Sequence, residues 1–258
     1  MPGEAPIVLL TDFGLKDHYV GVMKGVIAGL SPQASIIDLT HEIPPQDIRT
    51  ACFQLWAAYR YFPEGSIFVA VVDPGVGTRR KGLLLSAGGR FFLGPDNGLF
   101  SLILEEDPNF SAYALVNKDY FLPVISFTFH GRDIFAPCAA HLFNGAPLES
   151  FGPPIHDLVR LPLPRVVKEP GRLRGGVLHV DHFGNLITNI SAKDLCAHKV
   201  KKILFQGKSI PFLKTYAEGK EGEPLAIIGS SGLLEIAVYR GSAAKCLGKD
   251  GEVVVEWI

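Results

Sequence analysis

Three short hydrophobic runs alternate with two longer stretches of mixed polarity near the beginning of the chain. The runs cover residues 7–10, 36–39 and 67–72, and the longer stretches cover 17–30 and 46–61. In both longer stretches hydrophobic side chains recur every three or four residues, which is the spacing of a helix with one buried face. Strand, helix, strand, helix, strand in this order predicts a mainly parallel sheet with right-handed crossover connections.

The pattern changes after residue 80. Hydrophobic segments at 83–87 and 90–93 are separated by Gly88 and Gly89, which predicts a β-hairpin. A tight loop at 94–98 then precedes another hydrophobic segment at 99–104. A further helix is predicted after residue 133, where small and hydrophobic residues recur at helical spacing. These segments complete a predicted N-terminal α/β domain at residues 1–165.

Prolines and glycines gather between residues 162 and 171, which indicates a linker. Beyond it the longest predicted helix covers only 192–198. The remaining hydrophobic runs are short and strand-like, at 176–180, 186–190, 202–205, 225–228, 233–239 and 252–258. Short strands joined by glycine-containing turns indicate a small β-barrel or sandwich. The sequence therefore predicts a second, all-β domain at residues 170–258.

Composition narrows the class of protein. Of the 258 residues 47% are hydrophobic and 20% are charged, which is typical of a globular chain. A net charge of −1 without a long basic run argues against nucleic acid or a membrane surface as partner. We expect no signal peptide and no membrane span, because no hydrophobic run is long enough. The four cysteines have no CxxC spacing, which favours buried thiols in a reducing cytoplasm.

The stretch from residue 66 to 80 contains the most suggestive polar residue. Asp73 directly follows the third hydrophobic run and precedes a Pro-Gly-Val-Gly turn and the pair Arg79-Arg80. Open α/β sheets bind ligands at this end of their strands. Alternatively, Asp73 only begins a turn and both arginines are solvated. Other polar residues in loops of the same domain are Asp12, Asp96, Asn97, His130, Arg132 and Asp133, and the second domain has a polar loop from Asp181 to Asn185.

Several kinds of site are disfavoured by spacing. The sequence has no HxH, HExxH or DxD arrangement, which argues against a metal site. The glycines after Asp73 follow neither the P-loop nor the dinucleotide-binding pattern, and no GxSxG nucleophile is present. Carboxylates, arginines and a histidine remain, which suit positioning of a water molecule or binding of sugar hydroxyl groups.

Each candidate also has a structural interpretation. Asp12 offers two acceptor oxygens to a ribose, and its alternative role is to cap the helix that is predicted from residue 17. His130 could simply bond to the backbone in front of a helix. Arg132 and Asp133 could form only a local ion pair.

Six motifs occur in order along the chain. They are Thr11-Asp12-Phe13-Gly14 with Asp17 and Tyr19, Asp73-Pro74-Gly75-Val76-Gly77-Thr78, Gly94-Pro95-Asp96-Asn97-Gly98, His130-Gly131-Arg132-Asp133, Asp181-His182-Phe183-Gly184-Asn185, and Ser230-Ser231-Gly232 with Glu235-Ile236-Ala237. Together they resemble the S-adenosylmethionine hydroxide adenosyltransferases, or adenosine-forming S-adenosylmethionine hydrolases. This family is related to the adenosyl fluorinase and chlorinase. The resemblance covers nearly the whole chain.

The resemblance implies an N-terminal α/β domain, a C-terminal β-barrel and a homotrimer, whose location from the cysteine pattern is expected to be the cytoplasm. S-adenosylmethionine would bind between the N-terminal domain of one subunit and the C-terminal domain of its neighbour, without a metal or cofactor. Asp73, Arg80 and His130 would be the catalytic residues that activate water. Substrate would be bound by Asp12 at the ribose, by Asp181 and Asn185 at the methionine part, and further by Phe13, Asn97, Ser230, Glu235, Val238 and Tyr239.

The halogenating relatives differ at two of these positions. The fluorinase has tyrosine where Asp73 stands and serine where His130 stands. A carboxylate would repel a halide but accept a water, so Asp73 favours the hydrolase. Three alternatives stay open: an S-adenosylmethionine-dependent chlorinase, an adenosine-binding protein without catalysis, and a metal-dependent hydrolase whose Asp and His residues bind a cation.

Overall fold

A computed structural model describes residues 4–196 and 199–257 of the chain. The chain divides into two compact units, Met1–Leu161 and Pro162–Ile258. This boundary lies in the proline-rich stretch that the sequence marks as a linker. Each unit has a hydrophobic core of its own.

The first unit contains a six-stranded sheet in the order β2-β1-β3-β5-β4-β6. Its strands are β1 (Ile7–Thr11), β2 (Ile36–Thr40), β3 (Ile67–Val71), β4 (Gly82–Ala87), β5 (Arg90–Pro95) and β6 (Ser111–Ala114). Strands β2, β1, β3 and β5 run parallel, whereas β4 is antiparallel to both β5 and β6. The predicted mainly parallel sheet and the hairpin at Gly88-Gly89 are both confirmed.

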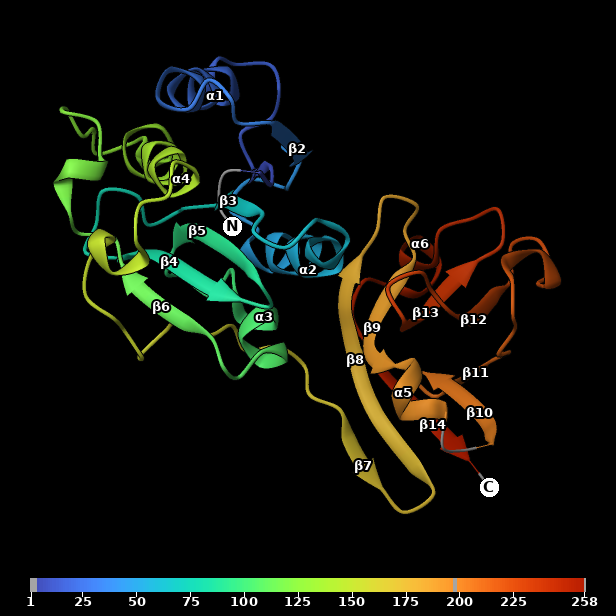
Figure 1. Ribbon diagram of the computed structural model, residues 1–258. Helices are drawn as coiled ribbons and strands as arrows, with labels where there is room; N and C mark the ends of the chain where they lie inside the picture. Colours follow the sequence, from blue (N-terminus) through green and yellow to red (C-terminus); the bar gives the residue numbers. More distant parts are fainter. Residues whose placement is uncertain (1–3, 197–198, 258) are drawn as a thin grey trace. The chain divides into compact units, whose positions relative to one another are not determined.

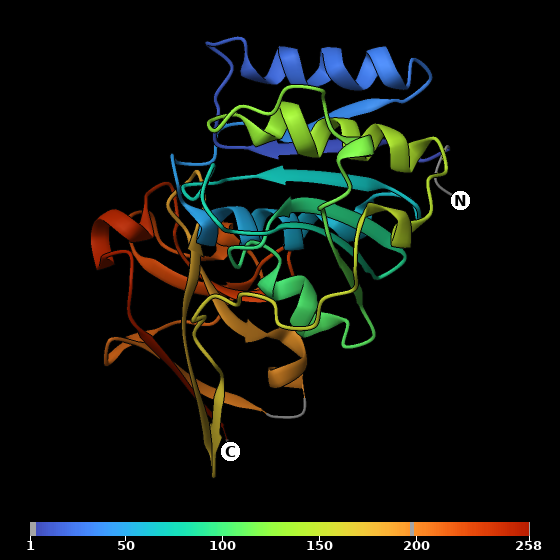
Figure 2. The same ribbon diagram turned by 90° about the vertical axis from the view of Figure 1, so that its left-hand side faces the viewer.

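Helices cover both faces of this sheet (Figures 1 and 2). Helices α1 (Tyr19–Leu30) and α4 (Ala136–Phe143) pack on one face, and α2 (Ile48–Ala58) and α3 (Ser101–Glu106) pack on the other. Successive residues of a strand face opposite sides. Ile7 and Leu9 of β1 therefore lie in the core under α1, while Val8 and Leu10 lie in the core under α2.

Helix α2 begins two residues later than the sequence predicts. Gln46 has a φ of 67°, a left-handed conformation that a helix cannot contain. Asp47 then caps the helix, because its side chain accepts a hydrogen bond from the Thr50 amide at 2.9 Å. Short helical turns complete the unit: η1 (Tyr59–Tyr61), η2 (Lys118–Tyr120), the π-helical η3 (Gly131–Phe135) and η4 (Leu148–Phe151).

The second unit is a nearly closed antiparallel barrel in the order β11-β10-β14-β8-β9-β13-β12, with β7 beside β8. A bridge from Phe212, just after β11, to Ala226 in β12 connects the two ends of this series. The strands are β7 (Val167–Glu169), β8 (Arg172–Val180), β9 (Leu186–Ser191), β10 (Val200–Phe205), β11 (Lys208–Ile210), β12 (Pro224–Ile228), β13 (Leu233–Val238) and β14 (Glu252–Trp257), and the helices are α5 (Ala192–Cys196), α6 (Ala243–Leu247) and η5 (Tyr216–Glu218). Residues 197 and 198 of the predicted helix, and residue 258 of the last predicted strand, lie outside the described residues.

The expectation of buried thiols is correct for Cys52 and Cys138 and wrong for Cys196 and Cys246. The two exposed cysteines belong to the short helices α5 and α6, which leave part of their circumference in solvent. Within the described ranges, no helix has both the length and the hydrophobicity to cross a bilayer.

Candidate active site

A cavity of about 350 Å³ lies in the first unit, at the carboxyl ends of β1 and β3. The two strands are parallel neighbours with Thr11 opposite Val71. The residues that follow each strand therefore meet at the same edge of the sheet, as expected for an α/β ligand site. The cavity is lined by Asp12, Phe13, Gln46, Val71, Asp73, Pro74, Val76, Thr128, Phe129, His130 and Gly131.

The turn after β3 brings Arg80 back to Asp73. The Thr78 hydroxyl donates to the Gly75 carbonyl at 2.7 Å, and the Arg80 amide donates to the Thr78 hydroxyl at 3.3 Å. Gly77 has a φ of +75°, and a Cβ on it would lie 2.2 Å from the Phe127 carbonyl oxygen. Only glycine therefore allows the turn to approach the loop before His130 so closely.

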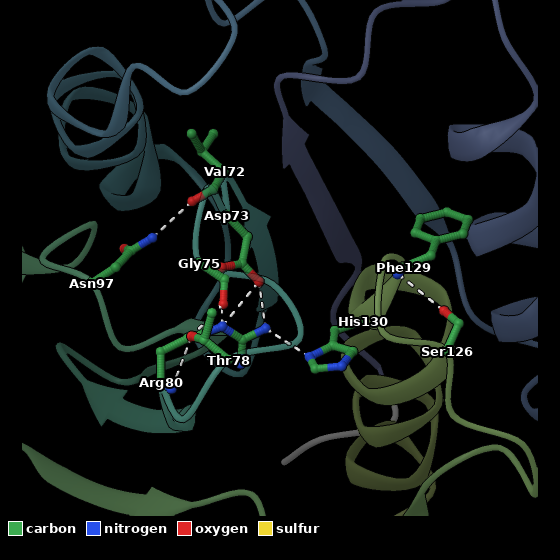
Figure 3. A network of polar contacts seen from close by, with 9 residues as sticks. All are labelled: Val72, Asp73, Gly75, Thr78, Arg80, Asn97, Ser126, Phe129 and His130. Atoms are coloured by element: carbon green, nitrogen blue, oxygen red, sulfur yellow. Dashed lines mark hydrogen bonds and ion pairs between the residues drawn. The ribbon is translucent and has the colours of Figure 1, made fainter.

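Asp73, Arg80 and His130 form one hydrogen-bonded group (Figure 3). Arg80 Nε lies 3.0 Å from each Asp73 carboxylate oxygen, and Arg80 Nη2 also bonds to Asp73 Oδ2. The same Nη2 lies 2.8 Å from His130 Nδ1. The Asp73 and Arg80 side chains are only 5% and 12% exposed, so water screens this pair weakly.

This geometry fixes the protonation state of His130. A guanidinium has only donors, so Nδ1 of His130 accepts from Arg80 and the ring proton of the neutral imidazole is on Nε2. Burial and the positive charge of Arg80 both lower the pKa of His130 below its usual value. His130 is therefore neutral at physiological pH and acts as an acceptor toward Arg80.

The other predicted residues of this unit are also near the edge of the sheet. Asn97 donates from Nδ2 to the Val72 carbonyl at 2.8 Å and thereby fixes the backbone just before Asp73. Asp12 accepts from the Gln46 amide at 2.8 Å. Its alternative role as a helix cap is excluded, because His18 precedes α1. The Phe13 ring packs edge-on against Phe129, with 5.7 Å between ring centroids.

Asp133 is completely buried and holds the loop that precedes His130. Its carboxylate accepts from the Ser126 amide at 2.8 Å and from the Ser126 hydroxyl at 2.7 Å. It also contacts Arg132, with 2.5 Å between Nε and Oδ1, so the local ion pair is present. Arg79 is exposed, whereas Arg80 is bonded to Asp73, so the alternative that both arginines are solvated holds only for Arg79.

Sequence reasoning missed Gln46, Thr128 and Phe129, which line the cavity. Gln46 lies in a loop after β2 and reaches Asp12 through its main-chain amide, which no side-chain pattern reports. Phe129 reads in the sequence as an ordinary core aromatic. Only the motif that begins at the neighbouring His130 could have directed attention to it.

The remaining predicted residues lie in the barrel unit. Asn185 donates from its amide and from Nδ2 to the Asp181 carboxylate, at 2.8 and 2.9 Å. Ser230 is exposed in the turn between β12 and β13, Val238 is buried at the end of β13, and Tyr239 follows it half-buried.

Glu235, on β13, is 5% exposed and accepts from the Tyr216 hydroxyl at 2.5 Å. Burial raises the pKa of Glu235, and burial together with the Glu235 carboxylate raises the pKa of Tyr216. In the two described ranges, no three histidine, cysteine or acidic side chains converge as metal ligands would.

Comparisons with known proteins show which family this chain is similar to. The family model of the SAM hydroxide adenosyltransferase N-terminal domain matches residues 7–152, and that of the C-terminal domain matches residues 175–256. A protein of Thermus thermophilus named (R)-S-adenosyl-L-methionine hydrolase is 45% identical over 95% of this chain and 97% of its own length. A protein of the same name from Salinispora tropica is 40% identical over 94% of this chain and 93% of its own length. More distant relatives are named fluorinase.

A solved structure is also similar. The crystal structure of an uncharacterized conserved protein from Thermotoga maritima has a TM-score of 0.88 and 38% identity, and the match covers 96% of this chain and 99% of that one. The two family models together span most of the chain. The chain belongs to the SAM hydroxide adenosyltransferase family.

Proposed function

We propose that this protein hydrolyses S-adenosyl-L-methionine to adenosine and L-methionine. The observation that supports this most strongly is the bonded group of Asp73, Arg80 and His130 beside a cavity that Asp12 also lines. The names of the relatives at 40–45% identity support the same substrate and reaction. No cofactor is part of the proposal.

In the proposed reaction, the oxygen of one water molecule attacks C5′ of the ribose. The C5′–S bond breaks, and its electron pair goes to the sulfonium, which becomes the neutral thioether of methionine. The water oxygen keeps one proton and becomes the 5′-hydroxyl of adenosine, and the other proton passes to the Asp73 carboxylate and from there to solvent. A sulfonium needs no protonation to leave, so the protein has to orient the water and exclude other solvent.

We assign the orientation of the water to Asp73. The Nδ1 lone pair of His130 is directed at Arg80, so it is not available to accept a proton from water. A free lone pair on an Asp73 oxygen can accept a hydrogen bond from the water molecule, while Arg80 stabilises the hydroxide character that develops on the water oxygen. His130 then holds Arg80 in place. A halide would meet the Asp73 carboxylate as a like charge, which favours water over chloride.

The remaining predicted residues receive roles as substrate contacts. Asp12 would bind the ribose hydroxyls beside Phe13, and Asn97 would support the strand end. Asp181 and Asn185 would hold the methionine part. Ser230, Val238 and Tyr239 would line the ends of the substrate, and Glu235 would contribute through Tyr216. We further propose a homotrimer in the cytoplasm, with each site formed by the first unit of one subunit and the barrel of its neighbour.

Incubation with S-adenosylmethionine, with and without chloride, followed by identification of the nucleoside product, tests the proposal. We expect adenosine in both samples, with no chlorinated nucleoside. The Asp73→Ala and His130→Ala variants should each be strongly impaired, while His141→Ala, outside the cavity, should retain activity. Wild-type rates in both site variants would refute the mechanism. Adenosine binding without any product would instead indicate a non-catalytic binding protein.

The metal-dependent alternative is tested with the same assay. Because the leaving group needs no Lewis acid, we expect full activity after exhaustive chelation. Loss of activity that a divalent cation restores would contradict the proposed mechanism.

A further inference from the structure

A buried histidine that belongs to none of the six motifs connects three segments next to the cavity. His41 follows β2 and is only 3% exposed. Its Nδ1 lies 2.8 Å from the hydroxyl oxygen of Thr11, which is completely buried at the end of β1. Its Nε2 lies 3.0 Å from Asp38 Oδ1, an ion-pair contact that is not well aligned as a hydrogen bond. The imidazole thus joins the ends of two neighbouring strands.

The connection continues to the surface. Asp38 also receives a hydrogen bond from Lys24 of α1 at 2.6 Å. Burial raises the pKa of Asp38, but the hydrogen bond from Lys24 and the contact with His41 outweigh it and lower this pKa overall. Asp38 is therefore a carboxylate at neutral pH and favours a proton on the His41 nitrogen that faces it, Nε2. Nδ1 is then free to accept from the Thr11 hydroxyl.

His41 holds the turn after β1 at both ends. At the first end, Thr11 bonds to the ring, and its hydroxyl oxygen accepts from the Phe13 amide at 3.2 Å. At the other end, the Gly14 amide donates to the His41 carbonyl at 2.8 Å. Asp12 lies between these two anchors. Its carboxylate accepts from Gln46, which belongs to the same loop as His41.

We propose that His41 is a positioning residue for the adenosine end of the substrate. It holds the turn from Thr11 to Gly14 and so fixes the direction in which the Asp12 carboxylate faces the cavity. This inference rests on the proposed function, because Asp12 is taken to bind the ribose hydroxyls. His41 itself contacts no substrate, and its effect passes through Thr11 and Gly14.

Kinetics of two substitutions at His41 test the inference. In His41→Ala the turn loses its side-chain anchor, and we expect KM for S-adenosylmethionine and Kd for adenosine to rise about tenfold, as when one good hydrogen bond is lost. The kcat should change far less, because this contact is equal in ground and transition state. In His41→Asn, an amide oxygen near the position of Nδ1 can still accept from Thr11, so part of the affinity should return.

Two further variants separate positioning from loss of stability. Asp38→Asn changes a partly exposed side chain at the far end of the network, so it should fold and raise KM in the same direction by a smaller factor. His141→Ala removes another partly buried histidine of the same unit and should leave KM unchanged. A merely structural role would lower the melting temperature and the active fraction of His41→Ala at unaltered KM. That result, or a loss of kcat at wild-type adenosine affinity, would overturn the inference.

Amide hydrogen exchange of the ligand-free protein gives a test that does not depend on turnover. In His41→Ala we expect faster exchange at Phe13, whose amide donates to Thr11, than in the wild type, with unchanged exchange at Val8 in the core of β1. The Gly14 amide keeps its bond to the main-chain carbonyl of residue 41 in this variant. Exchange at Phe13 that equals the wild-type rate in His41→Ala would refute the anchoring. If the turn is loosened but wild-type protein neither binds adenosine nor cleaves S-adenosylmethionine, the proposed function is wrong, and the substrate role of His41 falls with it.

Discussion

The guanidinium of Arg80 has two acceptors, the Asp73 carboxylate and the His130 imidazole, and lies 5.4 Å from the centre of the Phe135 ring. Its charge is almost fully removed from water. Such a pair gains little stability over apolar residues but is costly to break, because the remaining charge stays buried without a partner. We therefore interpret the pair as serving the reaction more than the fold.

A double-mutant cycle at Asp73 and Arg80 should show that removing one partner costs more stability than removing both. Arg80→Met leaves the Asp73 carboxylate unpaired, and we expect it to lower the free energy of unfolding by about 3 kcal/mol. Adding Asp73→Asn should restore a substantial part of this stability while activity stays lost. Urea denaturation measures both values. Equal stability of the single and double variants would contradict the argument.

The protonation of His130 should set the acidic limit of activity. Its folded-state pKa is lowered below the ordinary value of 6.5, first by burial and then by Arg80. The stability that neutral His130 contributes is complete above pH 6.5 and is lost as pH falls through the lowered pKa. Protonation places an N–H against Arg80, so we expect kcat to fall on the acidic side of pH 6.5. A pH profile measures this fall, and an inflection above 6.5 would contradict the assignment.

Among the individual residues of the candidate active site, only some could be predicted from the sequence. Asp73 and Arg80 are seven residues apart, joined by a glycine-containing turn, so the sequence indicates that they belong together. His41 and Gln46 could not be found in this way. Gln46 acts through its main chain, and the bond of His41 to Thr11 spans thirty residues.

At the level of elements, the turn from Asp73 to Arg80 depends on its contact with the loop that contains Phe127. Gly77 makes this contact without a side chain. The same loop is fixed from its other side by buried Asp133, through Ser126. The two segments that supply the proposed catalytic residues are therefore held in register by contacts outside the cavity.

A pair of glycine substitutions isolates this contact. In Gly77→Ala the new Cβ is attached to a left-handed backbone and also clashes with the Phe127 carbonyl. In Gly171→Ala the backbone has a similar φ of +77°, but no atom lies within 4 Å of the new Cβ. We expect about 1 kcal/mol of destabilisation for Gly171→Ala and a further 1–3 kcal/mol, about that of overpacking, for Gly77→Ala. Only Gly77→Ala should also lose kcat. Thermal unfolding and kinetics together provide the comparison, and equal behaviour of both variants would contradict it.

Elements were predicted best where hydrophobic periodicity is strong. The strands β1 and β3 and the helix α1 follow directly from the pattern. By contrast, β6 has the sequence Ser-Ala-Tyr-Ala, and β7 and β11 have three residues each, so no periodicity marks them. Their pairing with longer neighbours determines them, which is a tertiary effect.

At the scale of the whole molecule, the proposed substrate contacts come from both units of the chain. Asp12, Asp73, Arg80 and His130 belong to the first unit, and Asp181 and Asn185 belong to the barrel. The six motifs predict which residues take part. Their order along the chain carries no information on whether the barrel residues of a proposed site come from the same chain or from another copy, because sequence order does not report packing between the units.

Complementation between inactive variants tests the proposed trimer. If each site combines the first unit of one subunit with the barrel of the next, a mixed trimer of Asp73→Ala and Asn185→Ala subunits regains one intact site of its three, and about three quarters of the trimers are mixed. We expect about a quarter of wild-type activity after co-refolding of equal amounts. Co-refolded Asp73→Ala and His130→Ala should stay inactive, because both changes lie in the first unit. Absence of recovery in the first mixture would argue against sites shared between subunits.

The charges of Asp73, Arg80 and neutral His130 sum to zero, since one carboxylate is balanced by one guanidinium. Such a closed group has a field that decays within a few ångströms, unlike that of a lone buried carboxylate. The attraction that brings a cationic sulfonium to the site would therefore come from more distant carboxylates and not from the group of Asp73, Arg80 and His130. The chemical step itself should consequently be insensitive to ionic strength, while capture of the substrate should weaken as salt increases.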